Sequence, residues 1–302
     1  VDLLDILGRK ERVAEIITTE LNQIKAQFGD ARRSEISVFG GDISIEDLIT
    51  PQDMVVTLTH GGYMKAQPVA DYQAQKRGGR GKQAAATKDE DFIEKLFVAN
   101  THNYLLCFSS RGQMYWIKVY NLPQGSRTSR GKPIVNLLPL QEGECINAVL
   151  PVSAFSEDSY IFMATANGTV KKTPLSDFSR PRAAGIIAIS LDEGDKLIGV
   201  ALTGGDNQIM LFSDAGKAVR FEETNVRAMG RTATGVRGML LAEGQHVISL
   251  LATHADTTQQ VLTATVNGYG KRTPVSDYRQ ASRGTQGVIA INTADRNGKL
   301  VA

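Results

Sequence analysis

A short segment rich in cations and glycines carries the strongest chemical signal in this sequence. Its glycines let the backbone approach a ligand closely, so backbone N–H groups and cationic side chains can both reach phosphate oxygens. The segment lacks the GxxxxGK[ST] spacing of a nucleotide-binding loop, and taken alone it is also typical of disordered RNA-binding tails. It predicts contact with a phosphate backbone, and its members are Gln75, Lys76, Arg77, Gly78, Gly79, Arg80 and Gly81.

Cations recur along the rest of the chain in a regular way. Five segments, 76–82, 111–132, 171–182, 217–237 and 271–283, carry a combined formal charge of +18, so the net charge of +2 leaves −16 elsewhere. Dispersed, solvated surface charge would not recur in this way. The pattern predicts one positive track that binds phosphates by counterion release, without base specificity. The track comprises Lys65, Lys82, Lys118, Arg127, Arg130, Lys132, Lys171, Lys172, Arg180, Arg182, Arg220, Arg227, Arg231, Arg237, Lys271, Arg272, Arg279 and Arg283.

Residues that could catalyse a reaction or hold a metal are not suitably spaced. The sequence contains no GxSxG, HExxH or Cys–His signature, and its four histidines stand apart from other metal ligands. Cys107 and Cys145 form no CxxC pair, which predicts two reduced, buried thiols. No apolar run approaches the roughly 18 residues of a membrane span. The composition therefore favours a binding role without metal or membrane contact.

A repeated fold must position these cations, because a glycine-marked pattern recurs about every 50 residues. An apolar, strand-like run precedes each marker glycine, and the markers are separated by 50, 56, 48 and 52 residues. Asn-Gly at 167–168 and 267–268 is typical of tight hairpin turns that need positive φ. The markers are Gly62, Gly112, Gly168, Gly216 and Gly268.

Each repeat predicts about four short strands. Asp or Asn follows each marker glycine by nine residues, and a second glycine turn occurs at Gly143, Gly194, Gly244 and Gly298. A four-stranded sheet cannot cover both of its own faces, whereas sheets arranged around an axis cover one another. We therefore expect an all-β, propeller-like disc over 51–302, with five complete repeats and a truncated sixth whose first strand begins near Gly298.

The N-terminal residues 1–29 predict an amphipathic α-helix. Apolar residues from Val13 to Phe28 recur on one helical face, and Gly8 interrupts the pattern. Gly29 predicts a left-handed cap, and the polar residues 30–50 predict a linker. The chain begins at Val1 rather than Met, so we expect it to be part of a longer protein in which this helix packs on another helix.

The cationic glycine segment resembles the signature box of the DNA gyrase A subunit family, whose usual form is Gln-Arg-Arg-Gly-Gly-Lys-Gly. Here Lys76 stands for an arginine and Arg80 for a lysine, which keeps the charge but changes the phosphate geometry. Residues 1–29 resemble the end of that family's breakage–reunion core. The chain as a whole is similar to the family's C-terminal DNA-wrapping domain, with further resemblance at 96–102, 163–173, 226–230 and 267–273.

This resemblance implies a β-pinwheel of six blades that binds double-stranded DNA and wraps it with positive handedness. In the family the wrap enables negative supercoiling and depends on the box, a role that we carry onto Gln75 through Gly81. The resemblance implies an A2B2 complex, in which the partners are a second A subunit plus the gyrase B subunit. The catalytic tyrosine and the ATPase, with its ATP and Mg²⁺, lie outside this region in the family. We therefore expect no catalysis and no cofactor in this chain, and a cytoplasmic, chromosome-associated protein.

Three alternatives make different predictions. The C-terminal domain of a topoisomerase IV A subunit would be a related disc with a degenerate box, and the intact box at 75–81 argues against it. A propeller that serves as a protein-interaction scaffold would show no salt-sensitive DNA binding. A propeller hydrolase would need convergent carboxylates or a metal on its axis.

Overall fold

The computed structural model describes residues 2–34, 36, 44–72, 91–126 and 128–302. The chain divides into two compact units, residues 1–48 and 49–302. Within the described part, no helix is both long and apolar enough to cross a membrane.

The first unit is helical. It contains α1 (Asp2–Gly8), α2 (Lys10–Phe28) and the short 3-10 helix η1 (Ile45–Leu48). Arg9 is extended between α1 and α2, so the interruption predicted at Gly8 occurs one residue later. Gly29 has a φ of −72° and forms no left-handed cap, contrary to the prediction; the chain leaves the helix in an extended conformation.

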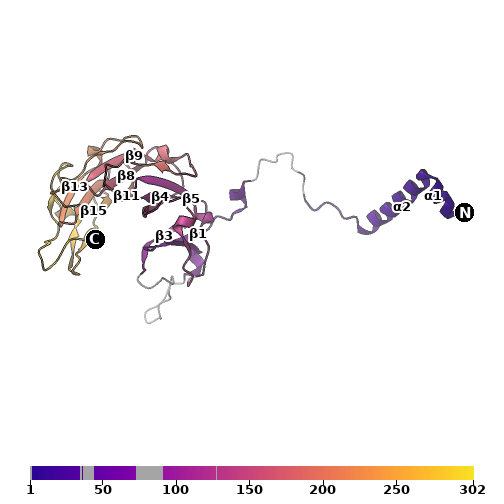
Figure 1. The fold of residues 1–302 in the computed structure, drawn as a ribbon, viewed down its shortest axis with the longest axis horizontal. Coiled ribbons are helices and arrows are strands. Elements are labelled where there is room, and N and C mark those ends of the chain that lie inside the picture. Colours follow the sequence, from indigo (N-terminus) through magenta and orange to yellow (C-terminus); the bar gives the residue numbers. More distant parts are fainter. Residues whose placement is uncertain (1, 35, 37–43, 73–90, 127) are drawn as a thin grey trace. The chain divides into compact units, whose positions relative to one another are not determined.

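The second unit is built on five β-hairpins whose strands are six residues long on average (Figure 1). All five marker glycines have positive φ, as the hairpin turns require. The hairpins are β1 (Asp53–Thr59) with β2 (Tyr63–Pro68), β4 (Tyr104–Ser109) with β5 (Gln113–Lys118), β8 (Tyr160–Thr165) with β9 (Thr169–Pro174), β12 (Gln208–Ser213) with β13 (Lys217–Glu222), and β16 (Gln260–Ala264) with β17 (Gly270–Pro274).

A 3-10 turn follows the second strand of every hairpin. These turns are η2 (Val69–Asp71), η3 (Val119–Asn121), η5 (Leu175–Phe178), η6 (Glu223–Asn225) and η7 (Val275–Asp277). A further turn, η4 (Ile134–Asn136), follows β6 in the second repeat.

Each of the first four hairpins gains a strand on both sides and becomes a four-stranded antiparallel sheet. The third strand comes from the same repeat and is β3 (Ile93–Asn100), β7 (Ile146–Val152), β11 (Leu197–Thr203) or β15 (Val247–Thr253). The fourth strand has only two residues and comes from the following repeat, as β6 (Lys132–Pro133), β10 (Ile186–Ile187), β14 (Val236–Arg237) or β18 (Val288–Ile289). Every one of these four sheets is thus completed by its neighbour.

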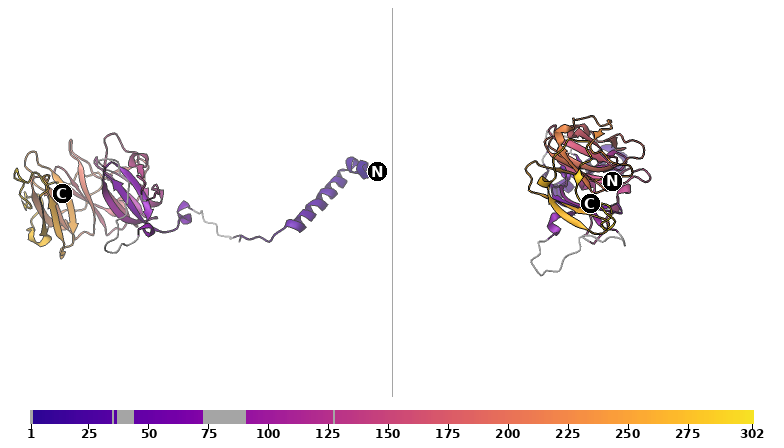
Figure 2. Two further views of the ribbon diagram at one scale, coloured as in Figure 1. Left: turned by 90° about the horizontal axis from the view of Figure 1, so that it is seen from below. Right: turned by 90° about the vertical axis from the view of Figure 1, so that its left-hand side faces the viewer.

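The sheets of the second unit follow one another in an arc about a common centre (Figure 1), and Figure 2 shows the same sheets from two other sides. Strand β11 packs against both β7 and β15 on the inner side of the arc, and β9 and β13 lie on its outer side. A Cβ at Gly199 of β11 would lie 2.8 Å from the Cβ of Leu250 in β15, so this close approach requires glycine. The arrangement confirms the predicted propeller-like, all-β class.

Four hydrophobic clusters fill the spaces between consecutive sheets. Phe108 and Phe178, from neighbouring repeats, are fully buried and meet edge to face at 6.1 Å between ring centroids. Phe212 and Tyr278 repeat this contact at 5.9 Å. Each buried aromatic ring contributes about 2–3 kcal/mol of transfer free energy, so the packing between sheets stabilises the arc.

The fifth sheet differs from the others, since its hairpin β16–β17 has no further named strand among the described residues. The sequence predicts that a sixth repeat starts near Gly298, but Leu300 pairs with Thr265, and the Val301 N–H donates to Ala264 O at 2.9 Å. Residues 300–302 therefore lie at the edge of the fifth sheet, where β3, β7, β11 and β15 lie in the other sheets. The prediction that these residues begin a sixth repeat is therefore wrong, and they belong to the fifth.

The two cysteines occupy different environments. Cys107 is buried in β4, and burial raises the pKa of its thiol to about 12. Cys145 is exposed, so the prediction of two buried thiols is wrong for this residue. It lies in the loop after the Gly143 turn, just before β7, where the chain runs over the surface.

Candidate nucleic-acid interface

Four equivalent segments run along the outer edges of the first four sheets. We call them crossovers and define them as residues 123–133, 179–187, 227–237 and 279–289. Each connects a 3-10 turn of its own repeat to the two-residue strand that it adds to the preceding sheet. Because the same strand of each hairpin receives a crossover, the four crossovers occupy matching positions around the arc.

Hydrogen bonds link consecutive crossovers over the last three repeats. The Ser190 hydroxyl, just after the second crossover, donates to Thr232 O in the third at 2.8 Å. The Gly284 N–H in the fourth crossover donates to Gly238 O, just after the third, at 2.6 Å. Arg283 also donates to Arg237 O at 3.1 Å. From the second crossover to the fourth, the outer edge is therefore a connected band rather than a row of separate loops.

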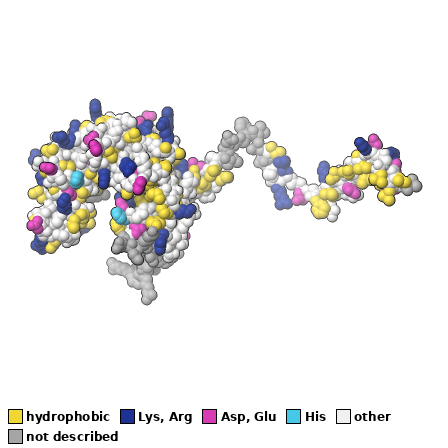
Figure 3. All heavy atoms as spheres, in the orientation of Figure 1, with side chains coloured by type: hydrophobic (Ala, Val, Ile, Leu, Met, Phe, Trp, Pro, Cys, Tyr) yellow, Lys and Arg dark blue, Asp and Glu magenta, His cyan; other side chains and the backbone are white. Residues whose placement is uncertain are grey.

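Exposed cations project from every crossover. In the space-filling view, several Lys and Arg side chains stand out at the outer margin of the second unit (Figure 3). Those side chains can reach a polyanion that runs along the edge, since they are themselves exposed. The exposed crossover cations are Arg130 and Lys132, Arg180 and Arg182, Arg227 and Arg237, and Arg279 and Arg283. Two further predicted track residues, Lys271 and Arg272 of β17, are also exposed.

Three of the predicted track residues are buried, and their placement on an exposed track is corrected. Lys65 is 1% exposed and its Nζ donates to Ser126 O at 3.1 Å and Ser129 O at 2.9 Å. Lys171 is fully buried, and its Nζ donates to Ala188 O at 2.7 Å and also to Arg231 O. Lys172 lies 3.7 Å from the buried Glu223 carboxylate and over the Tyr160 ring. Carbonyl, carboxylate and ring partners compensate the burial of these charges.

Lys118, Arg220 and Arg231 are partly exposed. Lys118 donates to His102 O at 2.8 Å and stacks over the Tyr104 ring. Arg220 donates to Val275 O at 3.0 Å and Tyr278 O at 3.3 Å, so it holds the 3-10 turn of the next repeat. Lys118 and Arg220 therefore hold neighbouring backbone in place. Arg231 lies in the third crossover, next to Thr232.

Burial lowers the pKa of Lys171 to about 8, with the nearby Arg231 charge adding to the effect. The unfolded chain binds this proton with an ordinary lysine pKa of 10.5. Between these values the unfolded state holds more protons than the native state, so this group makes the free energy of unfolding rise with pH from about 8 to 10.5. Denaturant titrations at pH 7.5, 9 and 10.5 should show the wild type gaining stability relative to Lys171→Met. A constant difference across these pH values would contradict the assignment.

The predicted box falls outside the described residues. Gln75 through Gly81, together with Lys82 and Arg127, therefore remain predictions from sequence. Among the residues that the structure does describe, no group of three His, Cys, Asp or Glu side chains could hold a metal ion.

Sequence reasoning missed the four glycines that anchor the crossovers. Each precedes a two-residue strand and has positive φ. A Cβ at Gly287 would lie 2.1 Å from Ala218 O, and one at Gly131 would lie 2.3 Å from Met64 O. They follow the marker glycine of their own repeat by 19, 17, 19 and 19 residues, a nearly constant spacing that could have revealed them. The four are Gly131, Gly185, Gly235 and Gly287.

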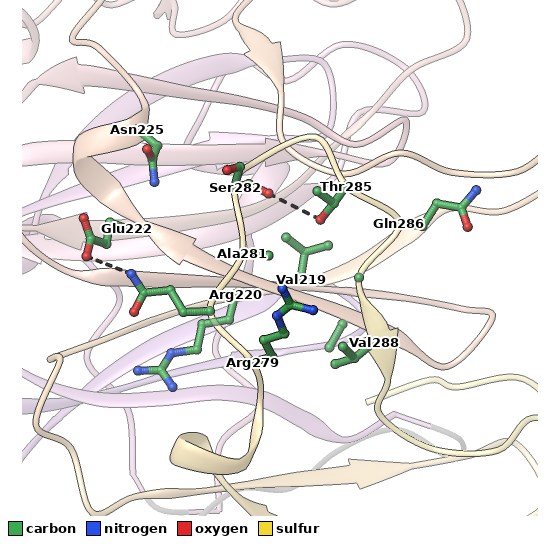
Figure 4. A pocket seen from close by; sticks show the side chains of 13 residues that line it. Val219, Arg220, Glu222, Asn225, Arg279, Ala281, Ser282, Thr285, Gln286 and Val288 are labelled. Atoms are coloured by element: carbon green, nitrogen blue, oxygen red, sulfur yellow. Dashed lines mark hydrogen bonds between the residues drawn. The ribbon is translucent and has the colours of Figure 1, made fainter.

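An open hollow of about 720 Å³ lies where the fourth crossover passes β13 (Figure 4). Arg220 and Arg279 both line it, and the Gln280 amide donates to the Glu222 carboxylate at 2.8 Å. A second hollow, of about 470 Å³, is lined by Arg180 and Arg231 between the second and third crossovers. Polar hollows that pair two arginines suit phosphate groups better than apolar ligands.

Comparison with known proteins agrees with this architecture. The family described as "DNA gyrase C-terminal domain, beta-propeller" matches five segments, residues 53–100, 103–153, 159–203, 207–254 and 259–302. Each of the first four segments contains one hairpin and the inner strand that pairs with it, and the fifth contains the hairpin β16–β17.

Relatives and solved structures point the same way. The chain is 58% identical to the A subunit of DNA gyrase from Salmonella typhimurium over 97% of its length, and 53% identical to that from Neisseria gonorrhoeae over 100%. It spans 33% and 37% of the length of those relatives. A structure of the DNA gyrase A C-terminal domain matches with a TM-score of 0.66 at 28% identity, covering 82% of this chain and 81% of that one.

The C-terminal domain of DNA topoisomerase IV also matches, with a TM-score of 0.70 at 29% identity over 83% of this chain and 76% of that one. The fold is thus shared by both types of domain. The high sequence identity to gyrase A subunits over the whole chain places it with gyrase. The chain belongs to the family of DNA gyrase C-terminal domains.

Proposed function

We propose that residues 49–302 bind double-stranded DNA without sequence specificity and wrap it around the outer edge of the arc. The observation that carries the proposal is the pair of exposed cations on each of four matching crossovers. A duplex that follows the edge meets a cluster of positive charge at every sheet. Such contacts fix the path of the phosphate backbone but read no bases.

The energetics of bending require several crossovers to act together. Bending 20–30 base pairs by 40–90° costs about 1–6 kcal/mol, and a larger turn costs more, on the order of 10 kcal/mol. One crossover cannot offset this cost in physiological salt, whereas four can. Binding should therefore weaken with salt at a log–log slope that corresponds to at least about six neutralised phosphates.

We further propose that the chain acts within a gyrase-type enzyme in the cytoplasm, together with a second A subunit plus the B subunit. The wrap would present a neighbouring DNA segment for directional strand passage, so that negative supercoils are introduced. ATP hydrolysis with Mg²⁺ and DNA cleavage belong to the other parts of that enzyme. The box at 75–81 is proposed as the part of the track on which supercoiling depends.

A topological assay tests the wrap directly. Relaxed circular DNA is incubated with the chain, relaxed again by a type I topoisomerase and freed of protein. A chiral wrap leaves a shift in linking number that grows with the protein-to-DNA ratio. The triple variant Lys76→Ala, Arg77→Ala, Arg80→Ala should abolish the shift, because the box no longer holds phosphate.

The matched control replaces Lys25, Arg32 and Arg33 by alanine, which removes the same charge from the exposed helix and linker. This control should leave most of the shift intact. The proposal fails if the wild type produces no shift, or if both triple variants reduce it equally.

A further inference from the structure

Two of the buried lysines connect parts of the outer edge that are far apart in sequence. Lys65 of β2 bonds to the carbonyls of Ser126 and Ser129 in the first crossover. Lys171 of β9 bonds to Ala188 O, just after the second crossover, and to Arg231 O in the third. Both lysines lie three residues after their marker glycine, so the same repeat position makes the same kind of contact.

The geometry leaves these ammonium groups with little to offer a DNA phosphate. At 1% and 0% exposure, the two side chains are covered by the segments whose carbonyls they bond. An ammonium has three donors, and at least two are used by backbone oxygens in each case. Carbonyl oxygens bonded in this way fix the backbone of an otherwise irregular segment.

We infer that Lys65 and Lys171 are positioning residues for the DNA-binding edge, which hold the crossovers in place and do not themselves contact DNA. Lys171 sets the spacing between the second and third crossovers, since it bonds to Ala188 O just after the second and to Arg231 O in the third. Its contact with Arg231 O fixes the backbone from which the Arg231 side chain projects beside the hollow shared with Arg180. This inference rests on the proposed DNA binding.

The fifth repeat offers a comparison within the same chain. Lys271 occupies the same position, three residues after Gly268, but it is exposed, and no described crossover lies on β17. The equivalent lysine is thus buried where a following crossover covers it and exposed where none is described. Burial of Lys65 and Lys171 therefore arises from the contact between repeats and not from the hairpin alone.

The test combines local hydrogen exchange with DNA affinity in a double-mutant cycle. Lys171→Met keeps the apolar length of the side chain and removes its donors. Backbone amides of residues 229–233 should exchange at least about tenfold faster, while the other sheets keep their protection. Lys271→Met, the same substitution at the matching exposed position, should leave exchange at 229–233 unchanged.

The affinity measurements separate positioning from direct contact. Arg231→Ala and Lys171→Met should each weaken DNA binding by about fivefold, and the double variant should be no weaker than either one. The log–log salt slope of the double variant should also correspond to about one neutralised phosphate fewer than that of the wild type, not two fewer. If the two losses of affinity multiply in the double variant and its slope corresponds to two fewer phosphates, Lys171 touches DNA and the inference is overturned. Unchanged exchange at 229–233 would overturn it as well.

If Lys171→Met does not fold, Lys65→Met provides the same test, with exchange read at residues 126 and 128–131 of the first crossover. Lys196→Met, which removes an exposed lysine outside the crossovers, controls for loss of charge. The outcomes also separate the inference from the proposed function. Wild-type protein that fails to bind DNA would contradict the function, whereas binding that Lys171→Met and Lys196→Met affect equally would contradict only the positioning role.

Discussion

Replacing Arg130, Arg182, Arg227 and Arg279 together by alanine is expected to weaken DNA binding by about a thousandfold at 0.1 M salt. The four side chains are exposed, one on each crossover, and none makes a hydrogen bond or ion pair within the described residues. Removing one phosphate contact lowers the log–log salt slope by about 0.9, so the slope should fall by about 3 to 4. Fluorescence anisotropy with a duplex of about 40 base pairs across a salt series measures both quantities.

The charge-matched control for this variant replaces Lys25, Arg32, Arg33 and Lys196, which are exposed cations outside the crossovers. Its affinity should change by less than about tenfold. Thermal unfolding should be nearly the same for the two variants, because every replaced side chain is exposed and the ion pair of Arg33 with Asp30 lies at the surface, where such pairs contribute little stability. Equal losses of affinity would mean that net charge, and not its placement on the crossovers, determines binding.

Gly287→Ala is expected to destabilise the second unit by about 3 kcal/mol or more and to lower its Tm by roughly 10 °C. Gly287 has a φ of 75°, which is unfavourable for alanine, and a Cβ there would lie 2.1 Å from Ala218 O. The clash involves backbone on both sides, so it can be relieved only by separating β18 from β13. The crossover that carries Arg279 and Arg283 would then lose its anchor.

Gly244→Ala separates the two causes of the destabilisation expected for Gly287→Ala, which are the positive φ and the steric clash of the added Cβ. Gly244 has nearly the same φ, 72°, but no atom lies within 4 Å of the added Cβ. It should cost only about 1 kcal/mol, the ordinary penalty for a left-handed alanine. Thermal unfolding followed by circular dichroism compares the two variants directly. Similar costs would show that the close approach at Gly287 is easily relieved and would contradict the anchoring role.

The parts of the fold that could be predicted from sequence are those with local signals. The marker glycines and the apolar runs before them define the hairpins, because turn geometry and strand patterning both depend on neighbouring residues. The two-residue strands could not be predicted in the same way. Lys132 and Pro133 form β6 only because β2, about seventy residues earlier in the chain, presents a free edge to them.

In the candidate site, too, features with local sequence signals could be predicted, and features that depend on distant contacts could not. Exposure of Arg182 and Arg279 follows from the ordinary behaviour of arginine in a polar segment. Burial of Lys171 could not be anticipated, since its two carbonyl partners come from segments 17 and 60 residues away in sequence. Residue type predicts the average environment of a lysine, whereas tertiary contacts determine each individual case.

The exchange of edge strands between repeats also bears on how this architecture can change in evolution. Because every interior repeat donates one short strand and receives another, a whole repeat can be inserted or deleted without leaving an unmatched junction. Loss of half a repeat would instead leave one neighbour without its outermost strand. The circumference of such a domain can therefore vary only in whole-repeat increments, and the contour length of nucleic acid that it accommodates would vary in the same increments.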